Sequence, residues 1–248
     1  MTNPSFEPAA FPVLVHDNHL IANFGDFTAL LDTGSPWSIS STVDEIQLPC
    51  MLESIRPVSD FMGKSVESIV EMVGHPFDVL MGLDCLGSFC WHVDGIGNDS
   101  SEPKLLIHLS SQMPSPTSSL SVMQFPELGT LPIGVISIEG HEVRAYLDTG
   151  AKISYLNKER QPCDDRPARE AVDFSPHFGE FTTRIREFDV LIGELRLNLP
   201  MGELPPVGNV FWNTFNVDAI LGLDLLRQLS VEFALPEEMI HFDPRDGA

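Results

Sequence analysis

One short phrase occurs twice in this chain of 248 residues, and a sequence that repeats it has few folds open to it. Residues 29–35 read Ala-Leu-Leu-Asp-Thr-Gly-Ser, and residues 145–151 read Ala-Tyr-Leu-Asp-Thr-Gly-Ala. In each copy an apolar run, typical of a buried strand, ends at one aspartate, Asp32 or Asp148. A single Asp-Thr-Gly could be an ordinary strand exit. Two copies in the same apolar context predict two related halves, each contributing one carboxylate to a shared site.

The duplication extends well beyond this phrase. Residues 78–86, Asp-Val-Leu-Met-Gly-Leu-Asp-Cys-Leu, match residues 218–226, Asp-Ala-Ile-Leu-Gly-Leu-Asp-Leu-Leu. Their runs of Leu, Ile and Met predict buried strands beneath the site rather than contacts with a substrate. The copies lie 116 residues apart at the two aspartates and 140 apart at Asp84 and Asp224. The second half therefore carries about 24 extra residues, an insertion of the kind that loops tolerate.

The order of these motifs resembles that of aspartic peptidases of the retropepsin and pepsin clan. Each lobe of those enzymes carries apolar-Asp-Thr-Gly-Ser/Ala, then a flap hairpin, then an apolar-apolar-Gly turn before a short helix. The resemblance covers nearly the whole chain, and Ser38, Ser154 and the phrase at 220–226 favour the retropepsin side. The only tyrosines, Tyr146 and Tyr155, lie beside the second aspartate, so the pepsin flap tyrosine has no counterpart.

The resemblance implies an all-β, bilobal acid-protease fold with two homologous β-barrel-like lobes and short helices. Residues 1–110 are expected to form the first lobe, 111–130 an interlobe linker and 131–248 the second lobe. Hairpins are expected over 12–23 and 133–143, and a short helix over 225–229. Retropepsins assemble their site from two subunits, whereas fusion of both lobes predicts that a monomer suffices.

The implied activity is that of an aspartic endopeptidase with Asp32 and Asp148 as its catalytic pair and with no cofactor or metal. Like charges a few ångströms apart cannot both ionise cheaply, so such a pair shares a proton and can supply both a base and an acid. By resemblance, Thr33 and Thr149 hydrogen-bond across the lobe interface. A Ser35 hydroxyl bond to Asp32 would make Asp32 the more acidic member. The loops also contain Gly34, Gly150 and Ala151, the two glycines allowing close backbone approach.

Two segments at equivalent places between the catalytic loop and the late apolar turn are candidate flaps. The residues expected to face substrate there are Phe61, Met62, Gly63, His177, Phe178 and Gly179. Simple anchoring of a loop remains an equal alternative for them. The apolar neighbours Ile39, Ile153 and Phe178 favour apolar residues around the scissile bond. The insertion includes the alternating residues 193–199 and the turn-rich residues 200–208; we expect it to flank the cleft and narrow specificity, or else to be an extra edge hairpin.

A cleft between two β-lobes predicts a peptide or protein substrate bound in an extended conformation. The formal charge of −22 argues against nucleic acid and anionic membranes as partners. Cys50, Cys85, Cys90 and Cys163 show no paired spacing, so the thiols are expected to be free and the protein cytoplasmic. His108 and His241 recur in both halves and are expected to be structural, because no second His or Cys stands at metal spacing.

Two other functions remain open from the sequence. One is a catalytically silent peptide-binding or scaffold protein that keeps the fold, which the loss of either aspartate would favour, yet both are present. The other is a self-processing precursor, although no obvious propeptide precedes Phe11.

Overall fold

The computed structural model describes residues 9–49, 51–61, 63–94, 96, 103–113, 115–125, 129–161, 167–176 and 178–245. Strands make up 50% of the described residues and helices 16%, so the expected all-β class is confirmed. Met62, His177, Cys50 and Cys163 lie outside the described residues. In the described part of the chain, no helix has the length and apolar character that crossing a membrane requires.

The first half begins with the expected hairpin, formed by β1 (Ala9–His16) and β2 (His19–Asn23). Its two turn residues, Asp17 and Asn18, both have positive φ, as the tight turns that suit twisted strands require. β3 (Thr28–Leu31) then pairs antiparallel with β2 and parallel with β6 (Val79–Met81). Because β3 has neighbours on both sides and three of its four residues are buried, its C-terminal end is held firmly.

The second half repeats this arrangement. β12 (Ile133–Ile138) and β13 (His141–Leu147) form the second expected hairpin, and β13 pairs parallel with β18 (Ala219–Leu221). Leu31 pairs with Met81 in the first half, and Leu147 pairs with Leu221 in the second. The duplication read from the sequence is therefore also a duplication of strand register.

Four α-helices accompany the strands. α2 (Leu83–Leu86) and α4 (Leu223–Gln228) follow the two apolar turns. The helix expected over 225–229 thus begins two residues earlier, and Leu229 already belongs to the next strand. α1 (Val66–Val73) and α3 (Asn209–Phe215) were not predicted. Short 3₁₀ turns are η1 (Lys158–Arg160), η2 (Pro206–Gly208) and η3 (Leu235–Glu237).

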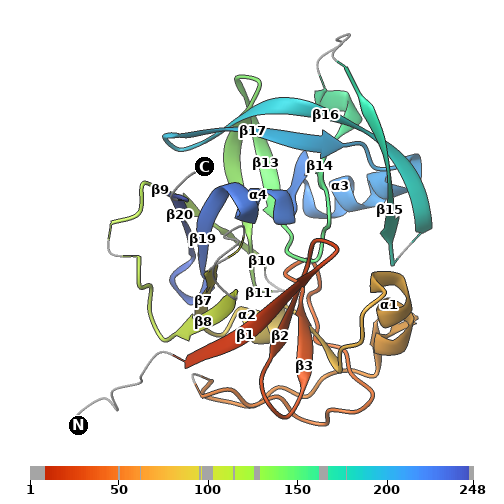
Figure 1. The fold of residues 1–248 in the computed structure, drawn as a ribbon. Helices are drawn as coiled ribbons and strands as arrows, with labels where there is room; N and C mark the ends of the chain where they lie inside the picture. The colour runs from red at the N-terminus through yellow and green to blue at the C-terminus, as the bar shows by residue number, and fades with distance from the viewer. Residues whose placement is uncertain are drawn as a thin grey trace.

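A nine-stranded sheet joins the two halves. Its order is β6-β3-β2-β1-β8-β7-β19-β20-β9, in which β7 (Cys90–Asp94) and β8 (Lys104–His108) meet β19 (Leu229–Ala234) and β20 (Met239–Pro244). Trp91 of β7 stacks on Phe233 of β19 with ring centroids 4.3 Å apart. The last strands of the chain therefore belong to the sheet of the first half, as Figure 1 shows, and not to the sheet of the second half.

The segment 111–130 does more than link the halves. It contains β9 (Ser118–Ser121), which pairs with β20 at the edge of the large sheet, and β10 (Met123–Phe125). β10 pairs with β11 (Gly129–Leu131), which already leads into β12. The expected linker therefore contains strands of its own, and alternate buried residues in β9 give that strand a packed face.

The insertion in the second half completes a closed sheet. β14 (Ser154–Leu156), β15 (Arg169–Ser175), β16 (Gly179–Ile192) and β17 (Leu195–Gly202) extend the order β12-β13-β18-β14-β17-β16-β15, and β16 also pairs with β12. The long β16 and β17 arch over this half in Figure 1. Residues 200–202, expected in a turn, continue β17, and β17 lies between β14 and β16. The extra hairpin is therefore not at an edge, because β17 has neighbours on both sides.

Candidate active site

The two aspartates stand at equivalent places on the paired strands. Asp32 follows β3 directly, and its backbone N–H donates to the Met81 carbonyl at 3.0 Å. Asp148 follows β13, and its N–H donates to the Leu221 carbonyl at 2.9 Å. Each aspartate is thus fixed by the parallel neighbour of the strand that carries it.

Two buried threonines tie the two loops to each other. The Thr33 hydroxyl accepts from the Thr149 N–H at 2.9 Å and donates to the Leu147 carbonyl at 2.7 Å. The Thr149 hydroxyl accepts from the Thr33 N–H at 3.1 Å and donates to the Leu31 carbonyl at 2.8 Å. Both residues are fully buried, so four satisfied hydrogen bonds hold the loops in one geometry. The expected contact across the halves is present.

The glycines after the threonines bring the carboxylates face to face. The Gly34 N–H donates to Asp32 Oδ1 and the Gly150 N–H donates to Asp148 Oδ1, each at 2.9 Å. A Cβ atom on Gly34 would overlap the Asp148 carboxylate, and a Cβ on Gly150 would overlap that of Asp32. Each aspartate therefore lies against the opposite loop, in space that only a glycine leaves open.

The two apolar turns support these loops from below. The Ser38 hydroxyl accepts from the Gly82 N–H and donates to Asp84 Oδ1, at 3.0 and 2.6 Å. In the second half the Ser154 hydroxyl accepts from the Gly222 N–H at 3.0 Å, and the Ser154 N–H donates to Asp224 Oδ2 at 3.2 Å. The prediction that these turns form the core beneath the site is confirmed, since Leu83 and Leu223 are buried.

Burial and proximity raise the pKa of both carboxyl groups. Burial, and next the charge of Asp148, raise the pKa of Asp32 well above its usual range. Burial raises the pKa of Asp148 to about 6, although the Gly150 N–H and a hydrogen bond with Asp32 favour its ionised form. The two groups hydrogen-bond to each other and titrate as a pair. Because the charge of one carboxylate opposes ionisation of the other, the pair shares a proton.

The hydrogen bond expected from the Ser35 hydroxyl to Asp32 is absent. The Ser35 hydroxyl donates to the Trp37 carbonyl at 2.8 Å and not to Asp32. With that bond directed elsewhere, the serine hydroxyl gives Asp32 no advantage over Asp148, whose loop carries Ala151 at the equivalent place.

Both candidate flaps are hairpins with a glycine of positive φ at the tip. β4 (Asp60–Phe61) and β5 (Lys64–Ser65) form the first, with Gly63 at φ 75°. β15 and β16 form the second, much longer one, with Gly179 at φ 80°. Of the predicted flap side chains, Phe61 and Phe178 line the cavity over the two aspartates. The two tip glycines do not line it.

The cavity contains further residues that the sequence analysis did not single out for it. They are mainly apolar or aromatic and include Phe174, Phe181, Leu204 and Phe211. Ile39 also lines the cavity, but Ile153, expected beside it, is buried elsewhere in the core. No regular spacing in the sequence indicates this lining, because Phe174 and Phe181 lie on two different strands of the flap hairpin.

One polar pair in the cavity was also missed. The Tyr155 hydroxyl donates to Asp173 Oδ2, which joins β14 to the second flap. Both side chains are buried, and burial raises the pKa of each. Asp173 interrupts an otherwise apolar run, Ala171-Val172-Asp173-Phe174. A charged residue in such a run indicates a buried polar partner.

No protein-family model matches this chain, and a search of curated proteins found no match. The geometry of the site therefore carries the functional argument.

Proposed function

We propose that this protein is an aspartic endopeptidase with the bilobal acid-protease fold, both lobes being supplied by one chain. The observation that carries the proposal is the pair of carboxylates, hydrogen-bonded to each other at the ends of two matching strands. The threonine bonds fix the separation of the two loops, and the shared proton gives the pair an acid and a base at once.

In the proposed reaction Asp148 is the base and Asp32 the acid. The ionised Asp148 carboxylate takes a proton from a water molecule, which attacks the peptide carbonyl carbon. The protonated Asp32 stabilises the oxygen that becomes negatively charged. Asp148 then passes the proton that it took from water to the leaving amine as the C–N bond breaks. The aspartates need no reorganisation for this, because backbone N–H groups and the opposite loop already fix both.

The cavity fits an extended peptide with apolar side chains. Most of the aromatic residues that line the cavity come from the second half of the chain. The first flap is short, since each of its strands has only two residues. We propose that the second flap makes most of the contacts with substrate, and that Phe174 and Phe178 favour apolar residues near the scissile bond. A monomer in the cytoplasm, acting on peptides rather than on nucleic acid or membranes, completes the proposal.

The test is incubation with a pool of peptides at roughly pH 4 to 7, with and without a pepstatin-type inhibitor, followed by mass spectrometry. We expect cleavage that the inhibitor suppresses and that Asp32→Asn and Asp148→Asn each abolish. The double variant should lose no more than either single one, because the pair acts as a unit. Peptide binding without any cleavage by the unmutated protein would instead indicate a silent scaffold.

A further inference from the structure

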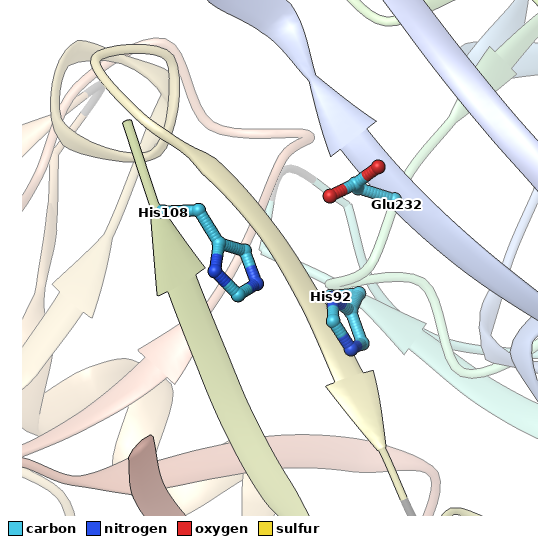
Figure 2. A group of neighbouring side chains, drawn as sticks. All are labelled: His92, His108 and Glu232. Atoms are coloured by element: carbon cyan, nitrogen blue, oxygen red, sulfur yellow. The ribbon is translucent and has the colours of Figure 1, made fainter. Parts of the chain in front are cut away.

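Three side chains that can bind a metal ion meet on one face of the large sheet, far from the aspartates in the strand order. His108 lies on β8, His92 on β7 and Glu232 on β19, three strands that are consecutive in the sheet. Their ligand atoms all lie within 4.8 Å of one another. Figure 2 shows the two imidazoles and the carboxylate side by side across these strands.

Strand register explains why they meet. His92 pairs directly with Glu232, so the two side chains point to the same face of the sheet. His108 pairs with Cys90, two residues from His92, and therefore lies diagonally beside it with ring centroids 5.4 Å apart. The alternate residues Trp91, Ile107 and Phe233 point to the other face and enter the core. Paired strands thus hold the cluster in place.

The histidines have unused nitrogen atoms. His108 is 5% exposed, and neither of its ring nitrogens has a hydrogen-bond partner among the described residues. Nδ1 of His92 is also without one. A buried polar atom with no partner costs free energy, and native structures rarely tolerate several together. A neutral imidazole nitrogen that makes no hydrogen bond offers a lone pair to a metal ion.

The Glu232 carboxylate is oriented by hydrogen bonds, yet one of its oxygens can still accept another ligand. Glu232 Oε2 accepts from the Ser111 hydroxyl at 2.5 Å and from the Met113 N–H at 3.2 Å. Among the described residues, Oε1 accepts only from the Gln112 N–H, at 2.9 Å. A carboxylate oxygen has two lone pairs, so Oε1 keeps one. Hydrogen bonds of this kind are what orient the ligands of metal sites.

We propose that His92, His108 and Glu232 bind a divalent transition-metal ion, with zinc as the best fit. Two imidazoles and one carboxylate are a ligand set that zinc accepts, with one tetrahedral position left for water. At tetrahedral angles, ligand bonds of about 2.0–2.2 Å place two ligand atoms about 3.4 Å apart. The three ligand atoms now lie within 4.8 Å of one another, so they must move closer together on binding. Because His92 is only half-buried, the ion can enter from the surface.

This site would link the two halves of the chain. His92 and His108 come from the first half and Glu232 from the second, and only two residue pairs join β7 to β19. An ion held across this junction would stabilise the sheet that unites the halves. Sequence spacing does not predict this metal site, because His92 and His108 meet through strand pairing. Most zinc motifs instead have ligands at short spacing in the sequence. The expectation that His108 is purely structural is revised accordingly.

The test uses the full chain, stripped with a chelator and then incubated with Zn²⁺ alone. After gel filtration we expect one zinc per chain. We also expect Tm to rise by about 5–10 °C at a free zinc concentration of a hundred times Kd. Co²⁺ in place of zinc should give the visible absorption bands of a tetrahedral site. No stoichiometric retention by the unmutated protein, or an unchanged Tm, would overturn the proposal.

Three variants locate the site. His92→Ala, at a half-buried position, should fold and lose the bound ion and the cobalt bands, and Glu232→Gln should do the same. The matched control is His75→Ala, because His75 is a partly exposed histidine beside His16 and outside the cluster. It should retain the ion. Equal loss of metal from the control, or full retention by a folded His92→Ala variant, would show that these residues do not form the site.

Discussion

Asp32 and Asp148 are identical side chains in nearly identical loops, and their behaviour follows from being close together. Burial disfavours the ionised form of each, and the charge of one opposes ionisation of the other. The local hydrogen bonds of the two loops match in partner and length. The division into acid and base is thus a property of the pair, which the sequence motif alone could not assign.

The activity should have a bell-shaped pH profile. Below the Asp148 pKa of about 6 both carboxyl groups are protonated and no base remains. Activity should therefore rise as pH increases through about 6, and fall at higher pH as Asp32 loses its proton. The measurement is kcat/KM for one cleaved peptide over roughly pH 4 to 9. A rate that keeps rising towards alkaline pH would exclude a protonated carboxyl group as the acid.

The same pKa shift predicts that the site costs stability. The pKa of Asp148 is higher in the folded chain than the ordinary aspartate value of about 3.9, so the folded state binds that proton more tightly. The unfolding free energy should then decrease as pH rises from about 4 to about 6. Asp148→Asn removes the buried charge, so thermal melts should show the variant more stable than the unmutated protein at neutral pH and similar to it at pH 3. A variant that is less stable at neutral pH would contradict this assignment.

The Thr33 hydroxyl should be required for the stability of the site. Thr33→Val leaves the Thr149 N–H and the Leu147 carbonyl, both buried, without that partner. We expect a loss of about 2–4 kcal/mol in the free energy of unfolding, measured with urea. Thr33→Ser keeps the hydroxyl and is the matched control, with a loss of about 1 kcal/mol for the missing methyl group. Equal losses in the two variants would show that packing, not hydrogen bonding, matters there.

At the level of elements, duplication made some features predictable. The constant spacing of 116 residues placed both flap tips correctly, because a repeated register carries a glycine of positive φ to the same place, Gly63 and Gly179. The strands that deliver the aspartates followed from their apolar runs. α1 was missed although Val66, Ile69 and Val73 share a buried face and Gly74 ends the helix in the left-handed region. The apolar residues there recur with the 3.6-residue period of a helix, so the sequence did contain the signal.

Other elements could not be predicted, because their partners lie far away in the sequence. β19 joins β7 across about 140 residues, and β16 closes the second sheet by pairing with β12. Nothing local in residues 229–234 distinguishes a strand that stays in its own half from one that crosses. The His92–His108–Glu232 cluster was not predicted for the same reason.

The insertion should matter more for folding than for specificity. Replacing residues 200–208 by a short turn would remove the pairing of Met201 with Ser154 and Arg186, so we now expect the variant not to fold. Leu204 alone reaches the cavity from this segment. Leu204→Ala should fold and alter the cleavage profile on a peptide library, whereas the exposed control Val207→Ala should not. Identical cleavage profiles for the two variants would show that Leu204 has no role in specificity.

The whole molecule is built so that neither half is complete alone. Strands from both halves form the nine-stranded sheet, and each aspartate-bearing loop is held by hydrogen bonds from the other. In a retropepsin-like dimer, equivalent contacts would come from a second subunit. Here one chain supplies both, so activity per chain should not fall on dilution.

Mixing two inactive variants tests most directly whether one chain builds one site from both aspartates. Asp32→Asn and Asp148→Asn are purified separately, and cleavage of a known peptide is measured for each and for an equal mixture. If Asp32 and Asp148 of the same chain form the pair, every molecule in the mixture lacks one carboxylate. The mixture should then be as inactive as either variant. Recovery of a substantial part of the unmutated activity on mixing would show that the pair forms between two chains, and substantial turnover by either variant alone would show that two carboxylates are not required.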